Sequence, residues 1–123
     1  MKAKSGFTLV EILIVVVILG ILAAVVIPQF TNASTEAKES CLKSDLRTMR
    51  SQIELYEIKN NDAHPATLGA LVPSYLREVP TNPFNDLATV GDGTNIGNGD
   101  NGWEYTVATG EVNADDSVAH GAW

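Results

Sequence analysis

Cysteine is almost absent from this chain of 123 residues, which has Cys41 alone. A single cysteine excludes an intrachain disulfide, the usual cross-link of small domains in oxidising compartments. Free cysteine is commonly buried as a small apolar side chain. We therefore expect Cys41 to pack in a core rather than to act as a redox centre.

Basic residues are missing from residues 78–123. No Lys or Arg follows Arg77, whereas the acidic residues after it are Glu78, Asp86, Asp92, Asp100, Glu104, Glu111, Asp115 and Asp116. The formal net charge of the whole chain is -7. Because such a surface repels phosphate groups, we expect no nucleic acid among the partners.

Signatures of catalysis and of metal binding are also lacking. No G-x-S-x-G or comparable nucleophile motif accompanies the serines and histidines, so we expect no enzymatic activity. His64 and His120 are too few and too far apart for a zinc site. Five aspartates offer oxygen ligands without the spacing of an EF-hand loop: Asp86, Asp92, Asp100, Asp115 and Asp116. Since Asp is an ordinary turn residue, the residues alone predict no metal site and no cofactor.

The N-terminal region consists of a basic leader and a near-unbroken apolar run. Residues 1–6 are MKAKSG, and residues 7–27 are FTLVEILIVVVILGILAAVVI. About 20 apolar residues are needed for a helix to cross a bilayer, so the run predicts one membrane-spanning helix. Lys2 and Lys4 favour a cytoplasmic N-terminus, which places the chain after Pro28 outside.

Glu11 is the one charged residue in the apolar run. A carboxylate costs about 2.5–3.5 kcal/mol at a bilayer centre, so a functional partner is expected. Gly6 offers a flexible boundary suited to a protease that would make Phe7 the new N-terminus, one helical turn before Glu11. A neighbouring subunit shifted along the axis would bring its amine to this carboxylate. The alternative is that Glu11 reaches the lipid headgroups from near the helix end.

The helix is expected to resume beyond Pro28, because residues 33–59 contain neither Gly nor Pro. One buried stripe of alternating four and three spacings supports this interpretation: Leu42, Leu46, Met49, Ile53 and Tyr56. Gly20 and Pro28 bracket a weak stretch, since Gly disfavours helix and Pro28 cannot donate to the carbonyl of Ala24. The stretch is therefore expected to kink, and also to melt or stretch when the chain leaves the bilayer.

The C-terminal part predicts a loop and a hairpin. Residues 91–102 are almost entirely Gly, Asn and Asp, which is typical of a loop. Trp103, Tyr105 and Val107 alternate with polar residues, and a turn is expected at Thr109-Gly110. Before this region, Thr67 is expected to cap a short helix that directs Leu68 and Leu71 to the core.

The segment K-S-G-F-T-L-V-E, with the apolar helix and Pro28 that follow, resembles the leader and N-terminal helix of type IV pilins and type II secretion pseudopilins. The resemblance covers Lys4 to about Phe30. It implies cleavage after Gly6 by a prepilin peptidase, N-methylation of Phe7, and pairing of Glu11 with the N-terminus of an adjacent subunit. It further implies the bacterial inner membrane before assembly, then a homo-oligomeric helical filament built with an assembly platform and other pilins, periplasmic or extracellular.

Many Gram-negative type IV pilins resemble one another in a C-terminal disulfide loop, and this chain departs from that pattern. The resemblance therefore favours the major pseudopilin of a type II secretion system. The alternative is a pilin of a surface type IV pilus for adhesion, motility or DNA uptake. A monomeric anchored binding domain would leave Gly6, Phe7 and Glu11 unexplained. Major pseudopilins also hold calcium in loops near the C-terminal sheet, so the resemblance keeps calcium open against the prediction of no metal.

The predicted fold class is α+β, in the form of a pilin fold. Residues 1–6 are the cleaved leader, residues 7–27 the membrane-spanning and filament-core helix, and residues 28–123 a globular domain. In that domain we expect the helix to about residue 60, a loop and short helix over 61–90, and a loop and hairpin over 91–123. The upper, amphipathic half of the helix is expected to pack on a small antiparallel sheet with long loops.

Overall fold

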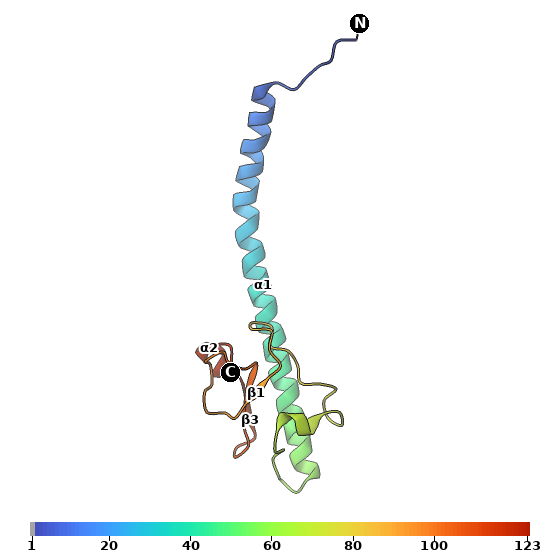
Figure 1. Cartoon of the computed structure of the whole chain (residues 1–123), viewed down its shortest axis with the longest axis vertical. Helices are drawn as coiled ribbons and strands as arrows, with labels where there is room; N and C mark the ends of the chain where they lie inside the picture. Colours follow the sequence, from blue (N-terminus) through green and yellow to red (C-terminus); the bar gives the residue numbers. More distant parts are fainter. Residues whose placement is uncertain (1) are drawn as a thin grey trace. The chain divides into compact units, whose positions relative to one another are not determined.

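The computed structural model describes residues 2–123. Its elements in chain order are α1 (Leu9–Lys59), η1 (Leu68–Leu71, a 3-10 helix), β1 (Val90–Gly91), β2 (Trp103–Thr106), β3 (Glu111–Ala114) and α2 (Val118–Gly121) (Figure 1). The chain divides into two compact units, residues 1–36 and residues 37–123, and α1 contributes residues to both. A long helix with a small sheet confirms the predicted α+β class.

In the first unit, α1 begins with a reciprocal cap between Thr8 and Glu11. The Thr8 N–H and hydroxyl donate to Glu11 Oε2 at 2.7 and 2.8 Å, and the Glu11 N–H donates to Thr8 Oγ1 at 3.2 Å. This is a capping box, in which two N–H groups that lack helical partners are satisfied together. The Thr-x-x-Glu spacing is the sequence signal for this cap, which was not predicted.

The helix continues through Gly20 and Pro28 without a break. Just beyond Pro28, the hydroxyl of Thr31 donates to the Ile27 carbonyl at 3.3 Å, and that of Thr35 to the Thr31 carbonyl at 3.1 Å. Such side-chain bonds compete with the helical ladder and often accompany bending. The stretch is thus helical in the single chain, and its melting on assembly stays a prediction.

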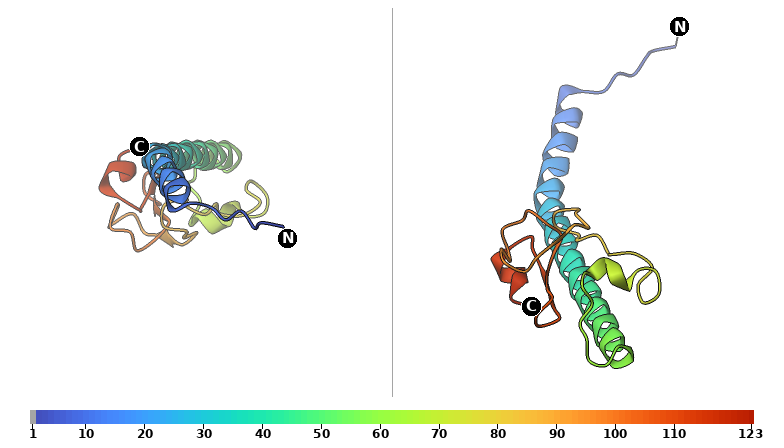
Figure 2. Two further views of the ribbon diagram at one scale, coloured as in Figure 1. Left: turned by 90° about the horizontal axis from the view of Figure 1, so that it is seen from above. Right: turned by 60° about the horizontal axis from the view of Figure 1, so that its bottom comes forward.

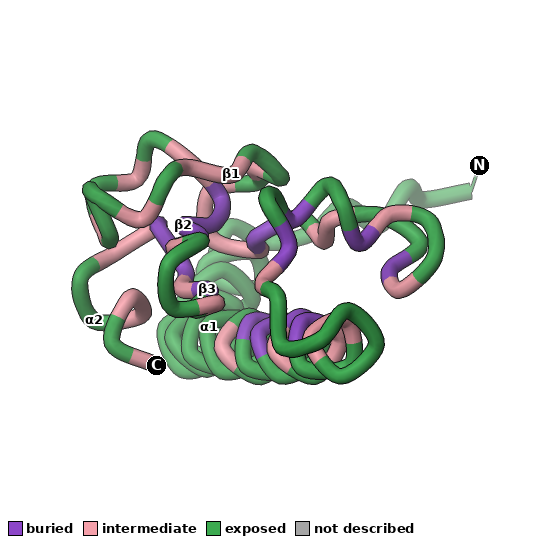
Figure 3. The backbone as a smooth tube through the Cα atoms, turned by 90° about the horizontal axis from the view of Figure 1, so that it is seen from below, coloured by how far each residue is buried: buried purple, intermediate pink, exposed green. Residues whose placement is uncertain are grey.

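The core of the second unit lies along α1, where the predicted stripe is confirmed. Leu42, Leu46, Met49 and Ile53 are at most 3% exposed. Tyr56 at the end of the stripe is half-buried and packs edge-on against Tyr75, with ring centroids 5.4 Å apart. Figure 3 shows these buried segments of α1 turned toward the strands and loops that pack on it.

The expectation that Cys41 is buried is wrong. The side chain is exposed, with its Sγ 3.6 Å from Asp45 Oδ2. One residue corresponds to about 100° around a helix, so the position beside buried Leu42 points away from the stripe. Cys41 is therefore exposed because of its position on the helix, although free cysteine is commonly buried.

The sheet has the order β1-β2-β3 and is mixed. The predicted hairpin is confirmed, since β2 and β3 pair antiparallel with Trp103 opposite Ala114 and Thr106 opposite Glu111. The expectation of a wholly antiparallel sheet is corrected by β1, which pairs parallel to β2. The long loop of residues 92–102 permits this pairing, because two parallel strands need a connection that brings the chain back to the end of the sheet where the first strand begins. Figure 2 shows that the strands and η1 both lie against the C-terminal part of α1.

Strand β2 departs from the predicted alternation of buried and exposed residues. Glu104 is only 2% exposed, whereas Val107, beyond the end of the strand, is 47% exposed. The Glu104 carboxylate accepts bonds from the Gly93 N–H at 2.5 Å and from Asn101 Nδ2 at 3.1 Å. A Cβ at Gly91 would collide with the same carboxylate. The loop after β1 therefore covers the face of β2 that the pattern assigned to solvent.

The two short helices differ in how well the sequence predicts them. The predicted short helix is η1, and Leu68 and Leu71 are buried as expected, although the Thr67 side chain makes no capping bond. Helix α2 was not predicted. It begins after Ser117, whose hydroxyl accepts a bond from the His120 N–H at 3.3 Å.

Candidate assembly site

The Glu11 carboxylate lies at the start of α1 beside an apolar hollow. This hollow has a volume of about 360 Å³ and is lined by Phe7, Glu11, Ile12, Ile14 and Val15. The structure thus brings together the two residues predicted to mediate assembly, Phe7 and Glu11. One oxygen of Glu11 accepts both bonds from Thr8, which leaves the other oxygen without a partner among the described residues.

The surface around this site is apolar and uncovered. Every residue from 2 to 36 is exposed. Helix α1 is long and apolar enough to cross a membrane, with a mean hydropathy of 3.3 in its most apolar 18-residue window. Contiguous exposed apolar surface of this extent requires lipid or protein to cover it.

Gly6 and Phe7 precede α1, and both are exposed and outside regular secondary structure. A Cβ at Gly6 would meet nothing within 4 Å, and the same holds for Gly20. The fold of the single chain therefore does not require glycine at position 6. Gly20 and Pro28 lie further along α1 and do not line the hollow at Glu11.

Both the N-terminal region and a longer part of the chain are similar to known proteins. Residues 1–27 match the family model of the prokaryotic N-terminal methylation motif. The chain is 36% identical over 102 residues to the type II secretion system core protein G of Pseudomonas aeruginosa, covering 69% of this chain and 71% of that protein. The chain belongs to the type II secretion system core protein G family.

Other relatives include a second core protein G and a component of a type IV pilus. The core protein G of Aeromonas hydrophila is 30% identical over 102 residues, with 69% of this chain and 71% of that protein covered. The type IV wide pilus major component PilA4 of Thermus thermophilus is 37% identical over 82 residues, with 67% of this chain and 62% of that protein covered. No solved structure matches the chain significantly.

Asp115, one of the five aspartates considered as oxygen ligands, holds the loop of residues 92–102 in this chain. Asp115 is fully buried and accepts bonds from the N–H groups of Gly97 at 2.7 Å, Asn98 at 3.1 Å and Asn101 at 2.8 Å. The Gly99 N–H donates to the Asp115 carbonyl at 2.6 Å. The only signal in the sequence was an acidic residue after a Gly- and Asn-rich loop.

The five aspartates considered for calcium do not converge in the structure. Asp116 contacts the His120 ring and accepts a bond from Asn82 Nδ2 at 2.9 Å, and Asp92 accepts bonds from Thr94. Among residues 2–123 no group of three or more His, Cys, Asp or Glu side chains is arranged to hold a metal ion. Calcium binding stays a prediction, which melting of the chain with chelator and with added calcium would test.

Three groups able to do acid–base or nucleophilic chemistry either bond to a structural partner or keep their protons at neutral pH. His64 Nδ1 lies 2.6 Å from Glu57 Oε1, which ties the loop after α1 to the helix. Desolvation, together with the charge of Asp45, raises the pKa of the Cys41 thiol, so it is protonated at neutral pH. Burial, and then the charge of Glu57, raises the pKa of Tyr105 to about 12.

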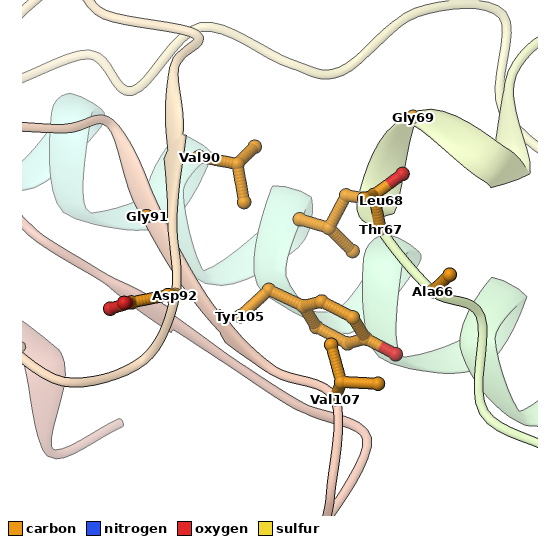
Figure 4. A pocket seen from close by; sticks show the side chains of 9 residues that line it. All are labelled: Ala66, Thr67, Leu68, Gly69, Val90, Gly91, Asp92, Tyr105 and Val107. Atoms are coloured by element: carbon orange, nitrogen blue, oxygen red, sulfur yellow. The ribbon is translucent and has the colours of Figure 1, made fainter.

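A pocket of about 270 Å³ lies between η1 and the sheet (Figure 4). The side chains of Leu68, Val90 and Val107 make it apolar, and that of Asp92 points away from it. The Tyr105 hydroxyl at its side donates to the Pro65 carbonyl at 2.8 Å. The lining of this pocket therefore offers a mainly apolar surface.

Proposed function

We propose that this chain is a structural subunit that polymerises into a helical filament, the pseudopilus of a type II secretion system. The observation that carries the proposal is the placement of Phe7 and Glu11 together at the exposed start of an apolar helix. A plain membrane anchor has no need of a carboxylate at that position. A filament subunit needs it, because the N-terminal amine of a neighbouring subunit must be neutralised once that amine leaves the headgroup region.

Before assembly, the chain is a single-pass protein of the bacterial inner membrane with a cytoplasmic N-terminus. Lys2 and Lys4 hold the leader inside, and residues 28–123 lie in the periplasm. Prepilin peptidase cuts between Gly6 and Phe7, and Phe7 is then N-methylated. The exposed, irregular backbone of residues 2–8 supports access by the peptidase.

During assembly, the amine of an incoming Phe7 meets Glu11 of a subunit already in the filament. The capping bonds from Thr8 use one carboxylate oxygen, so the other is available for the amine. The neighbouring hollow accepts the apolar N-terminal residue that carries this amine. Two opposite charges then share a desolvated site that neither would occupy alone.

The alternative function is a surface type IV pilus, which the similarity to the Thermus thermophilus pilus component supports. Imaging the assembled protein in a host with its secretion genes separates the two. We expect short periplasmic fibres that disappear when the inner-membrane assembly platform of the secretion system is deleted. Long extracellular fibres that persist in that deletion would favour the type IV pilus, and a chain that stays monomeric in the membrane would refute both.

A further inference from the structure

A pocket on α1 in the second unit gathers positive charge. It has a volume of about 260 Å³ and is lined by Lys43, Leu46, Arg47, Arg50 and Trp123, and we call it the cationic pocket. Spacings of four and three residues place its three basic residues on one side of the helix. Lys43 Nζ lies 4.1 Å from the centroid of the Trp123 ring, and Arg50 donates to the main-chain oxygens of Trp123 and Val112 at 2.8 and 2.9 Å.

Arg50 is engaged by the main-chain oxygens of Trp123 and Val112, whereas Lys43 and Arg47 make no ion pair with an Asp or Glu side chain among the described residues. Arg47 is exposed. Over residues 2–123, the ion pairs with Asp or Glu side chains involve His64 and His120 only. A basic pocket that is lined by an aromatic ring and left without an acidic side chain is suited to bind a carboxylate from outside.

Carboxylates without basic partners lie in the loop of residues 92–102. Asp92 and Asp100 are exposed, and their bonds are to neighbours in the loop, Thr94 and Asn98. Hydrogen bonds from Thr94 lower the pKa of Asp92, which keeps it ionised. The three N–H bonds to buried Asp115 hold the loop in shape, so little ordering is needed for it to dock.

We propose that the cationic pocket of one subunit binds Asp92 and Asp100 of a second copy of this chain. The two surfaces differ, so the contact is heterologous, and a heterologous contact that does not close into a ring repeats along a helical filament. Charge complementarity of this kind also steers subunits into register. The inference rests on the proposed filament function and adds a contact between globular domains to the contact at Glu11.

Charge reversal with matched controls tests the contact in the full chain. Arg47→Glu is expected to lower filament yield about threefold or more, since exposed ion pairs are individually weak. Arg77→Glu, which makes the same charge change at an exposed residue outside the pocket, is expected to leave the yield unchanged. Asp100→Lys should also lower the yield, whereas Glu78→Lys should not. Combining Arg47→Glu with Asp100→Lys should restore filaments.

Cross-linking gives a second readout that does not depend on yield. In a Cys41→Ser background, a chain with both Arg47→Cys and Asp100→Cys should form a ladder of disulfide-linked multimers in filaments, and each single variant should not. Failure of the wild-type chain to form filaments would refute the proposed function. Wild-type filaments with neither a ladder nor an effect of Arg47→Glu beyond that of Arg77→Glu would overturn this inference alone.

Discussion

At the scale of single residues, Glu11 has one task in the structure and a second task in the proposed filament. In the single chain its carboxylate caps α1 through Thr8. In the proposed filament it neutralises the amine of another subunit. A glutamine in the same place still completes a capping box but carries no charge. The two tasks are therefore distinguishable by substitution.

The first prediction concerns this separation. Glu11→Gln should keep the helix start and lower filament yield at least tenfold, because an unpaired buried amine costs more than the pair it came from. Glu11→Leu should insert into the membrane as well as the wild type and also fail to assemble. The control is Thr8→Val, which removes the hydroxyl of the cap and keeps the carboxylate. The measurement is filament yield per inserted, cleaved subunit, and near-normal yield for Glu11→Leu would rule out an assembly role.

The second prediction concerns processing at Gly6. A Cβ there meets nothing in the chain, so Gly6→Val should leave the fold intact and block cleavage by the peptidase. Mass spectrometry of wild-type filaments should find a chain that begins at Phe7 with one added methyl group. Gly20→Val, at a second glycine with open space around it, is the control and should be cleaved normally. Assembled fibres that retain Met1 would contradict the prediction.

At the scale of elements, the loop of residues 92–102 behaves as a structured unit because Asp115 bonds to it from the end of β3. Charge-assisted bonds to a buried carboxylate contribute about 1.5–3 kcal/mol each at most, and removing the carboxylate leaves its donors without partners. The loop also covers Glu104 on β2. The order of this loop therefore depends on the buried carboxylates of Glu104 and Asp115 rather than on the composition of the loop.

The third prediction follows from this anchoring. Asp115→Ala should lower the free energy of unfolding by about 2–4 kcal/mol, since three N–H groups lose their acceptor in a buried site. The control is Asp100→Ala at an exposed position, which should change the free energy of unfolding little. Asp86→Ala is less suitable, because position 86 has a positive φ of 57°. Urea unfolding of the detergent-solubilised chain measures both. Equal midpoints for the two variants would contradict the anchoring role of Asp115.

At the scale of the whole molecule, the buried core of the described residues lies entirely in the second unit. Residues 37–123 bury the stripe of α1 against η1 and the sheet, while every residue from 2 to 36 is exposed. The first unit must therefore be stabilised by lipid before assembly and by other subunits after it. Tyr105 links parts of the second unit, since its hydroxyl on β2 donates to Pro65 in the segment before η1.

The fourth prediction uses this tyrosine to test the core by pH. The pKa of Tyr105 is raised to about 12 in the folded chain from an ordinary value of about 10. Above pH ~10 the unfolded chain loses this proton while the folded chain keeps it, so stability should fall between about pH 10 and pH 12. The Tyr105→Phe variant should be less stable at neutral pH by about 1 kcal/mol. Its free energy of unfolding should fall less steeply than that of the wild type between about pH 10 and pH 12. Parallel falls for the two proteins would contradict burial of the hydroxyl.

The sequence alone determined the features that depend on local pattern. Three features follow from neighbouring residues and their spacing: the apolar run of residues 7–27, the stripe from Leu42 to Ile53, and the hairpin after Trp103. Thr8 and Glu11 belong to this class as well, because a capping box is written within four residues.

Only the tertiary structure decided the features that depend on distant partners. Burial of Glu104 and Asp115 requires the loop of residues 92–102 to fold over the sheet, and no local pattern encodes that fold. The cationic pocket exists because Arg50 bonds to Trp123, 73 residues away in sequence. The residue type alone does not tell whether an Asp or Glu is buried. A carboxylate can be buried where long-range packing brings N–H donors to it.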